Sequence, residues 1–123
     1  MSDASLLYRQ VHPSWVQQGR VTSQAFKPTP KDGKRLSMYD GDRISAESAW
    51  KHFTVTLGFL SAGVLAVSHG ECHSVELPVE PDPEPFPEHL VIRFDGLSAA
   101  EITIAAKSLR QAAAARGWQY AAG

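Results

Sequence analysis

Short runs of β-forming residues recur along this chain, and most of them are bounded by glycine, proline or aspartate. They are LLYRQV (6–11), RVTSQAF (20–26), RLSMY (35–39), GVLAVS (63–68), HLVIRF (89–94) and, near the end, WQY (118–120). Runs of this length between turn residues are typical of strands. Because each strand must pair its backbone groups with a neighbour, we expect the runs to share one sheet.

Two segments have the residue spacing of an amphipathic helix. The first begins after Ser45, a favourable N-cap, and ends at Gly58. In the second, Ser98 and Glu101 have the spacing of a capping box, and Gly117 ends the pattern. The apolar positions three and four residues apart predict one buried face on each helix.

The remaining segments are expected to be connections. HPSWVQQG (12–19) is predicted to form a short helical turn, KPTPKDGK (27–34) a stiff loop, and LPVEPDPEPFPEH (77–89) an extended, exposed segment. The element order is then β-β-β-α-β-β-α, with a possible last strand. This order predicts an α+β fold, a mixed or antiparallel sheet with two packed helices, in a single domain spanning residues 1–123.

Composition narrows the class of protein. The chain has 123 residues, 43% hydrophobic and 20% charged, which is ordinary for a globular domain. No apolar run approaches the length of a membrane span, and the N-terminus lacks the pattern of a secretory signal. The single cysteine, Cys72, excludes an internal disulfide and favours a reducing compartment. We therefore expect a cytoplasmic protein.

Charge is divided unevenly along the chain. Basic side chains gather around the loop between the second and third predicted strands: Lys27, Lys31, Lys34, Arg35 and, further on, Arg43. Acidic side chains gather in the proline-rich segment and just before it: Glu76, Glu80, Asp82 and Glu84. Both are candidate surfaces for binding a partner protein, and a solvated surface is the alternative. The net charge of −1 makes nucleic acid an unfavourable partner.

The segment HGECH (69–73) contains three residues that can bind zinc, His69, Cys72 and His73. A closed zinc site needs a fourth ligand at a regular spacing, and this segment offers none. We therefore predict a polar loop without a metal, and an unreactive thiol at Cys72.

One resemblance bears on function. The order LLYRQVHPSWVQQGRVTSQAF, LSMYDG and ISAESAW within residues 6–50 resembles small ADP-ribosyltransferase-like folds, including the RES-type toxins. The matching positions are Arg9, Ser23 and Tyr39, with Glu88 much later in the chain. The resemblance implies an NAD cofactor. Arg9 would hold a phosphate or ribose, Ser23 and Tyr39 would shape the nicotinamide pocket, and Glu88 would orient a ribose hydroxyl.

Two functions follow as expectations. The first is a small cytoplasmic protein that binds another protein, as an accessory, immunity or antitoxin-like component, without a cofactor or an evident catalytic site. The alternative is a minimal ADP-ribosyltransferase-like enzyme that uses NAD, or an inactive relative of one. An enzyme would gather Arg9, Ser23, Tyr39 and Glu88 in one cleft, whereas a binding module would present an exposed patch. The oligomeric state stays open.

Overall fold

The computed structural model describes residues 1–29, 31 and 33–122, and its main feature is one antiparallel sheet. The strands of this sheet lie in the order β6-β7-β4-β1-β5-β8, and every pairing in it is antiparallel. The strands are β1 (Leu6–Val11), β2 (Val16–Gln17), β3 (Arg20–Val21), β4 (Arg35–Asp40), β5 (Gly63–Ser68), β6 (Val79–Pro81), β7 (His89–Arg93) and β8 (Tyr120–Ala121), of which β2 and β3 form a separate hairpin.

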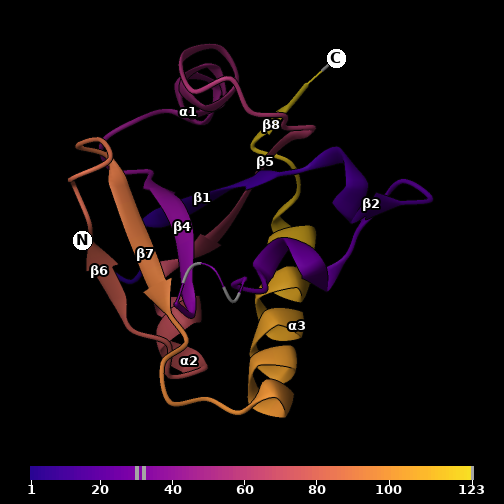
Figure 1. Cartoon of the computed structure of the whole chain (residues 1–123), viewed down its shortest axis with the longest axis vertical. Helices are drawn as coiled ribbons and strands as arrows, with labels where there is room; N and C mark the ends of the chain where they lie inside the picture. The colour runs from indigo at the N-terminus through magenta and orange to yellow at the C-terminus, as the bar shows by residue number, and fades with distance from the viewer. Residues whose placement is uncertain (30, 32, 123) are drawn as a thin grey trace.

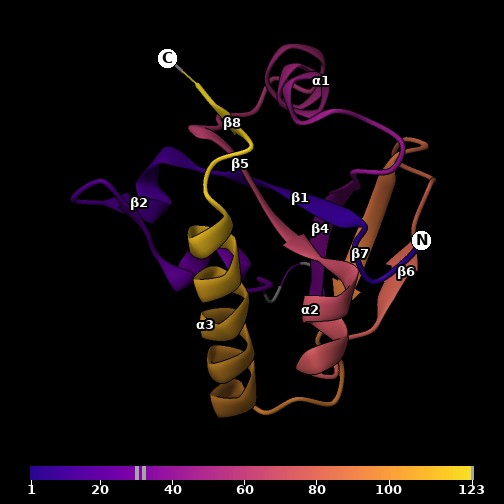
Figure 2. The ribbon, with the colours of Figure 1, turned by 180° about the vertical axis from the view of Figure 1, so that it is seen from behind.

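Helices cover both faces of the sheet. The α-helices are α1 (Ala46–Lys51), α2 (His69–Ser74) and α3 (Ala99–Arg116), and a π-helical turn, His52–Thr56, extends α1. α2 and α3 lie on one face, which is seen in Figure 2, and α1 lies at one end of the molecule in Figure 1. α1 packs against β1, β5 and β8. The chain therefore has the predicted α+β fold, and its described residues form three α-helices instead of two and a wholly antiparallel main sheet.

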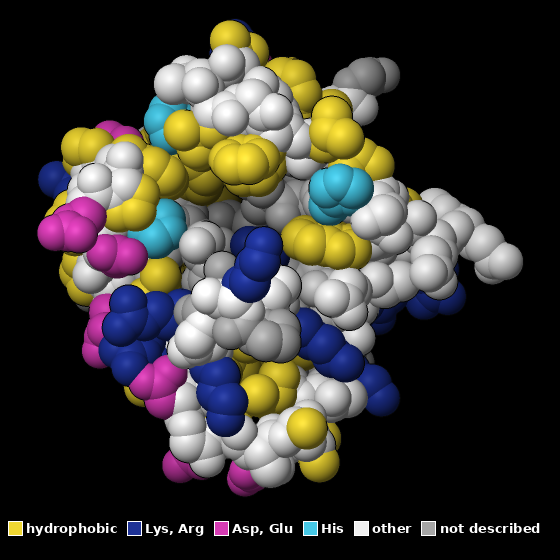
Figure 3. All heavy atoms as spheres, viewed as in Figure 1, with side chains coloured by type: hydrophobic (Ala, Val, Ile, Leu, Met, Phe, Trp, Pro, Cys, Tyr) yellow, Lys and Arg dark blue, Asp and Glu magenta, His cyan; other side chains and the backbone are white. Residues whose placement is uncertain are grey.

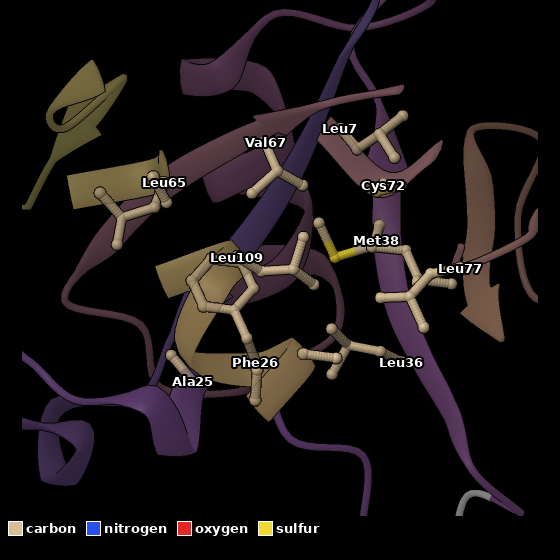
Figure 4. Close-up of a cluster of buried hydrophobic side chains, with 14 of the residues drawn as sticks. Leu7, Ala25, Phe26, Leu36, Met38, Leu65, Val67, Cys72, Leu77 and Leu109 are labelled. Atoms are coloured by element: carbon tan, nitrogen blue, oxygen red, sulfur yellow. The ribbon is translucent and has the colours of Figure 1, made fainter. Parts of the chain in front are cut away.

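The main core lies between the sheet and α3. Alternate residues of a strand point to one face, so Leu7 and Val11 of β1 join Leu36 and Met38 of β4 in this core. Figure 4 shows Met38, Leu36 and Leu77 converging with Phe26 and Leu109, which lies on α3. All six residues of β5 are buried, because the helices cover its two faces. The sheet face opposite this core carries Tyr8, Tyr39, Val64 and Ala66.

The prediction of a strand over residues 20–26 is wrong. β3 ends at Val21, and Ser23–Phe26 form a 3₁₀ helix. Gln18 and Gly19 both have positive φ, of 52° and 76°, so residues 16–21 turn back as a tight hairpin. The β-type composition of the segment reflected this hairpin and the burial of Ala25 and Phe26, not a long strand. The helical turn predicted at residues 12–19 shortens to a 3₁₀ turn at Pro13–Trp15.

The polar loop predicted at HGECH is also wrong, because this segment is helix α2. Ser68 and Glu71 form a reciprocal capping box, in which the Ser68 hydroxyl accepts from the Glu71 amide at 3.0 Å and Glu71 accepts from the Ser68 amide at 2.7 Å. The structure confirms the capping box that the sequence predicts at Ser98 and Glu101. The helix packs on the main core through Cys72, whose side chain is fully inaccessible to solvent.

The proline-rich segment is partly a strand. Val79–Pro81 pair with β7 at the edge of the sheet, where proline's missing amide hydrogen is tolerated. The predicted bounds of β1, β4, β5, β7 and β8 agree with the observed bounds to within two residues. The helix predicted from Ser45 to Gly58 corresponds to α1 and its π-helical turn.

Glu71 joins α2 to α3, since its carboxylate also accepts two hydrogen bonds from Arg116, at 2.8 and 3.1 Å. Partial burial acts to raise the pKa of Glu71, but the hydrogen bonds from Arg116 and Ser68 outweigh it and lower that pKa. We expect Glu71→Gln to lower the free energy of unfolding by about 1–2 kcal/mol at pH 7.

This contribution has a defined pH dependence. A depressed folded-state pKa means that the stabilisation is present above the ordinary carboxyl pKa and is lost as pH falls through the folded value. Urea unfolding of the wild type and of Glu71→Gln at pH 7 and near pH 3 measures the difference. The difference in the free energy of unfolding between the two proteins should be larger at pH 7 than near pH 3. An equal difference at both pH values would contradict the lowered pKa of Glu71.

Candidate functional site

A cleft of about 400 Å³ opens on the sheet face opposite the main core. Its floor is made by β1, β4 and β7, and its two walls come from the segment after α1 and from the proline-rich loop that precedes β7. Figure 3 shows this face, hollowed near its centre, with hydrophobic side chains along one margin and Lys or Arg and His side chains around it. The side chains that line the cleft are Arg9, Gln10, Arg35, Ser37, Met38, Tyr39, Phe53, Leu57, Phe59, Asp82, Pro85, Phe86, His89 and Val91.

Strand register brings the floor residues together. Tyr39 of β4 lies opposite His89 of β7, and Ser37 lies opposite Val91. Residues two apart on a strand share a face, so these four residues lie on the face of the sheet that carries the cleft. Met38 and Leu90 are buried in the core, and Met38 also reaches the lining of the cleft. The floor is therefore a direct result of the pairing of β4 with β7.

The rings of Tyr39, Phe86 and His89 line one side of the cleft, and the ring of His52 packs against the first two. Tyr39 stacks on Phe86 at 4.8 Å between ring centroids, and the rings of His52 and His89 contact Phe86 at 4.6 and 5.1 Å. The Tyr39 hydroxyl and His52 Nδ1 are 2.8 Å apart and share a hydrogen bond. Burial, with a contribution from the negative charge of Glu88, raises the pKa of Tyr39. The phenol therefore stays protonated at neutral pH and can donate or accept a hydrogen bond.

Two arginines provide positive charge at the cleft. Arg9 is held in place: its Nε donates to the Ala25 carbonyl at 2.7 Å, one terminal nitrogen donates to the Ser37 carbonyl at 3.0 Å, and its guanidinium lies over the Trp15 ring. Arg35 is exposed and is held by no ion pair within the described part of the chain. A fixed cation beside a free one is a favourable arrangement for an anionic group.

Arg35 has a neighbour of like charge. It lies directly opposite Arg93 of β7, a placement that is unfavourable for two cations. Arg93 is compensated by Glu80, at 2.8 Å, and by Asp95. Arg35 is the member of the pair whose charge remains available to a ligand.

Gln10 adds a buried donor to the cleft. Its side-chain carbonyl accepts from the Ser61 hydroxyl at 2.8 Å, which orients the amide group. Among the described residues no acceptor lies within hydrogen-bond distance of its Nε2, and the residue is only 5% exposed. A buried donor left without a partner is costly, so a ligand acceptor at this point would be well recognised.

The four residues of the enzyme hypothesis are only partly gathered. Arg9 and Tyr39 both line the cleft. Ser23 lies in the 3₁₀ helix and faces a different hollow, shared with Lys107 and Arg110. Glu88 is near enough to Tyr39 to influence its pKa but does not line the cleft.

The basic side chains do not form one surface. Lys34 donates to the Leu97 carbonyl at 2.9 Å and Arg35 lines the cleft, whereas Arg43 lies beyond the other end of β4 and donates to the Pro87 carbonyl at 3.0 Å. Lys27 is half-buried and Lys31 is exposed. The length of β4 therefore separates Arg43 from Lys27, Lys31, Lys34 and Arg35.

Two of the acidic side chains make contacts within the fold. Glu80 pairs with Arg93, and Asp82 Oδ2 lies 3.5 Å from His89 Nδ1 in the cleft. Glu76 and Glu84 are exposed. Part of the negative charge of the proline-rich segment is thus paired with basic side chains of the same fold.

Sequence reasoning missed several cleft residues. Gln10 and His89 were not proposed as site residues, and neither were the aromatic walls Phe53 and Phe86. An amide next to Arg9 in a strand that is otherwise aliphatic or aromatic was the available signal for Gln10, and a histidine opening a strand was the signal for His89. Their convergence depends on strand pairing, which the sequence does not display.

An exposed apolar patch lies at the rim of the cleft. Val55, Leu57, Phe59 and Leu60 follow α1 and are 77%, 40%, 57% and 66% exposed. Leu57 and Phe59 also line the cleft wall, so the patch and the cleft are continuous. Exposed large apolar side chains that gather in one place are typical of a binding surface.

Comparison with protein-family models, with curated proteins and with solved structures finds no match to this chain. Within residues 1–29, 31 and 33–122, no helix combines the length and the apolar character needed to cross a membrane.

Proposed function

We propose that the protein binds a nucleotide-like ligand, a flat ring joined to an anionic group, in the cleft over β1, β4 and β7. The observation that carries the proposal is the combination of aromatic walls with Arg9 and Arg35 in a single concave site. Its volume of about 400 Å³ lies within the range of small-molecule sites.

The aromatic walls suit a planar ring. Phe86 stacks on Tyr39 on one side of the cleft, and Phe53 lies 5.1 Å from Phe59 on the other. A ring between these walls would bury apolar surface on both of its faces, and offset stacking on aromatic side chains adds about 0.5–1.5 kcal/mol beyond burial. Gln10 Nε2 and the Tyr39 hydroxyl would then meet polar atoms at the ring edge.

The arginines suit a phosphate. Arginine binds phosphate through paired N–H donors, and hydrogen bonds to charged groups are stronger than neutral ones. The unfavourable juxtaposition of Arg35 and Arg93 is more readily understood if Arg35 serves a ligand.

The resemblance to ADP-ribosyltransferase-like folds makes NAD⁺ the first ligand to test. It implies roles for Arg9 and Tyr39, and both line the cleft. Transfer or cleavage would also need a carboxylate beside the developing positive charge. Asp82 is in the cleft but faces His89, and Glu88 is outside its lining. The geometry therefore supports binding more directly than turnover, as in an inactive relative of such an enzyme.

A thermal-denaturation titration with NAD⁺ tests the proposal. A ligand that binds only the folded protein stabilises it by about 2.7 kcal/mol at a hundredfold excess over Kd. We expect the Tm to rise with NAD⁺, less with AMP, and least with inorganic phosphate or nicotinamide alone. No shift with any of these at millimolar concentration would reject a nucleotide as the ligand.

The exposed patch supports a second candidate function, the binding of a partner protein as an accessory, immunity or antitoxin-like component. Val55, Leu57, Phe59 and Leu60 supply its apolar contacts, and Lys27, Lys31 and Lys34 supply positive charge elsewhere on the surface. We expect this action in the cytoplasm, since a chain with a single cysteine forms no internal disulfide and fits a reducing compartment. A Tm unaffected by NAD⁺ and its fragments would make this function the leading one.

A further inference from the structure

Three side chains from two distant segments meet at the start of α2. His69 and His73 are four residues apart on the helix, so their rings lie on the same side, 4.2 Å apart between centroids. Asp3 Oδ1 lies 3.4 Å from His73 Nδ1. One nitrogen or oxygen from each of the three residues falls within 4.8 Å of the other two.

The N-terminal segment is docked where Asp3 can take part. The Gly70 amide donates to the Asp3 carbonyl at 2.9 Å, and the His69 amide donates to the Ser5 carbonyl at 2.9 Å. A side chain at position 70 would crowd Asp3, since an added Cβ would lie 3.1 Å from the Asp3 Cβ. The glycine therefore allows the close approach that brings the carboxylate to the two imidazoles.

His69 has an unmet polar atom at this place. Its Nδ1 is buried, and within the described residues it has no hydrogen-bond partner. A buried nitrogen without a partner costs free energy. A metal ion bound by Nδ1 would compensate this cost, and so would a water molecule that the ion holds within hydrogen-bond distance of Nδ1.

From this geometry we propose that Asp3, His69 and His73 bind a divalent transition-metal ion, with Zn²⁺ the ion tested. Two imidazoles and one carboxylate are ligands that zinc accepts, at about 2.0–2.2 Å, and water completes the coordination. Ligand atoms around a tetrahedral ion are about 3.4 Å apart at those bond lengths. The side chains of His73 and Asp3 are 56% and 81% exposed, so both can move the short distance required.

Cys72 takes no part in this site, although it lies between the two histidines in the sequence. Its side chain is fully buried in the core. Burial, with a contribution from the charge of Glu71, raises the pKa of the Cys72 thiol to about 12. Zinc binds the thiolate, which this environment suppresses. The third ligand comes instead from Asp3, which no local spacing in HGECH could indicate.

Isothermal titration of tag-free protein with Zn²⁺ tests the site. We expect one ion per chain, and a Kd at least about tenfold weaker in His69→Gln, His73→Gln and Asp3→Asn. His12→Gln is the matched control, because His12 is an exposed histidine that contacts Ser14 and Trp15 elsewhere on the surface. It should leave the Kd unchanged, and Mg²⁺ should give no heat of binding.

Two outcomes would overturn the proposal. One is the absence of Zn²⁺ binding by the folded wild type. The other is binding that survives His73→Gln and Asp3→Asn, or that is lost in His12→Gln or Cys72→Ala. His73 and Asp3 are exposed, so their variants should fold even where His69→Gln does not. NMR spectra of the histidine rings provide the second measurement, since Zn²⁺ should shift the ring signals of His69 and His73 but not those of His12.

Discussion

Replacing Phe26 with alanine is expected to lower the free energy of unfolding by about 3–5 kcal/mol. Phe26 is fully buried at the end of the 3₁₀ helix Ser23–Phe26, which packs against α3. Figure 4 shows its ring beside Leu109 and Ala25. Truncation removes the ring from its apolar surroundings and leaves a cavity that a 3₁₀ helix anchored on both sides cannot close.

The loss should be large against the stability of the whole protein. Domains of this size are stable by about 5–15 kcal/mol, so the Tm should fall by roughly 10–20 °C. Chemical denaturation followed by circular dichroism measures the change. Phe59→Ala is the matched control, because the same ring is deleted at a position that is 57% exposed. We expect that control to change stability by less than about 0.5 kcal/mol, and a similar loss in both variants would contradict this packing.

Replacing Arg35 with glutamine is expected to weaken ligand binding at the cleft by about ten- to hundredfold. A charge-assisted hydrogen bond is worth about 1.5–3 kcal/mol, and each 1.4 kcal/mol is about tenfold in affinity. This prediction rests on the proposed nucleotide ligand, so NAD⁺ is the probe. The Kd of the wild type and of Arg35→Gln should be measured by calorimetry at low salt, where exposed charges are least screened.

The stability of Arg35→Gln separates a binding role from a structural one. Removing Arg35 relieves its repulsion with Arg93 and breaks no ion pair of the described residues. We therefore expect an unchanged or slightly higher Tm without ligand, together with a smaller Tm shift on adding NAD⁺. Arg20→Gln is the control, since Arg20 is exposed on the β2-β3 hairpin and outside the cleft. Equal weakening in both variants would indicate nonspecific charge attraction.

Local signals predicted most of the secondary structure. The capping box at Ser98 and Glu101, the N-cap at Ser45 and the bounded runs of β1, β4, β5 and β7 appear in the structure as expected. These features depend on residues within a few positions of one another, which is the range over which propensity, capping and turn chemistry act. The same kind of signal was present but unused at Ser68 and Glu71, where it begins α2.

The segment from Ser23 to Phe26 shows where local reasoning ends. It belongs to RVTSQAF (20–26), a run that predicts a strand, yet the hairpin before it and the core behind it make a 3₁₀ helix that inserts Phe26 more favourable. Tertiary burial outweighs a propensity that spans at most about 1 kcal/mol per residue. The acidic and basic segments show the same limit, since Glu80 and Arg43 are engaged within the fold.

The sequence by itself determined the α+β class, the positions of β1, β4, β5, β7, α1 and α3, and the single cysteine of this protein, because these follow from composition and from neighbours in the chain. Only the tertiary structure decided which side chains meet. The β4-β7 register places Tyr39 against His89, and the docked N-terminal segment places Asp3 against His73. Both candidate sites join residues far apart in sequence, and such contacts are set by strand pairing and burial across the whole fold, which no local pattern records.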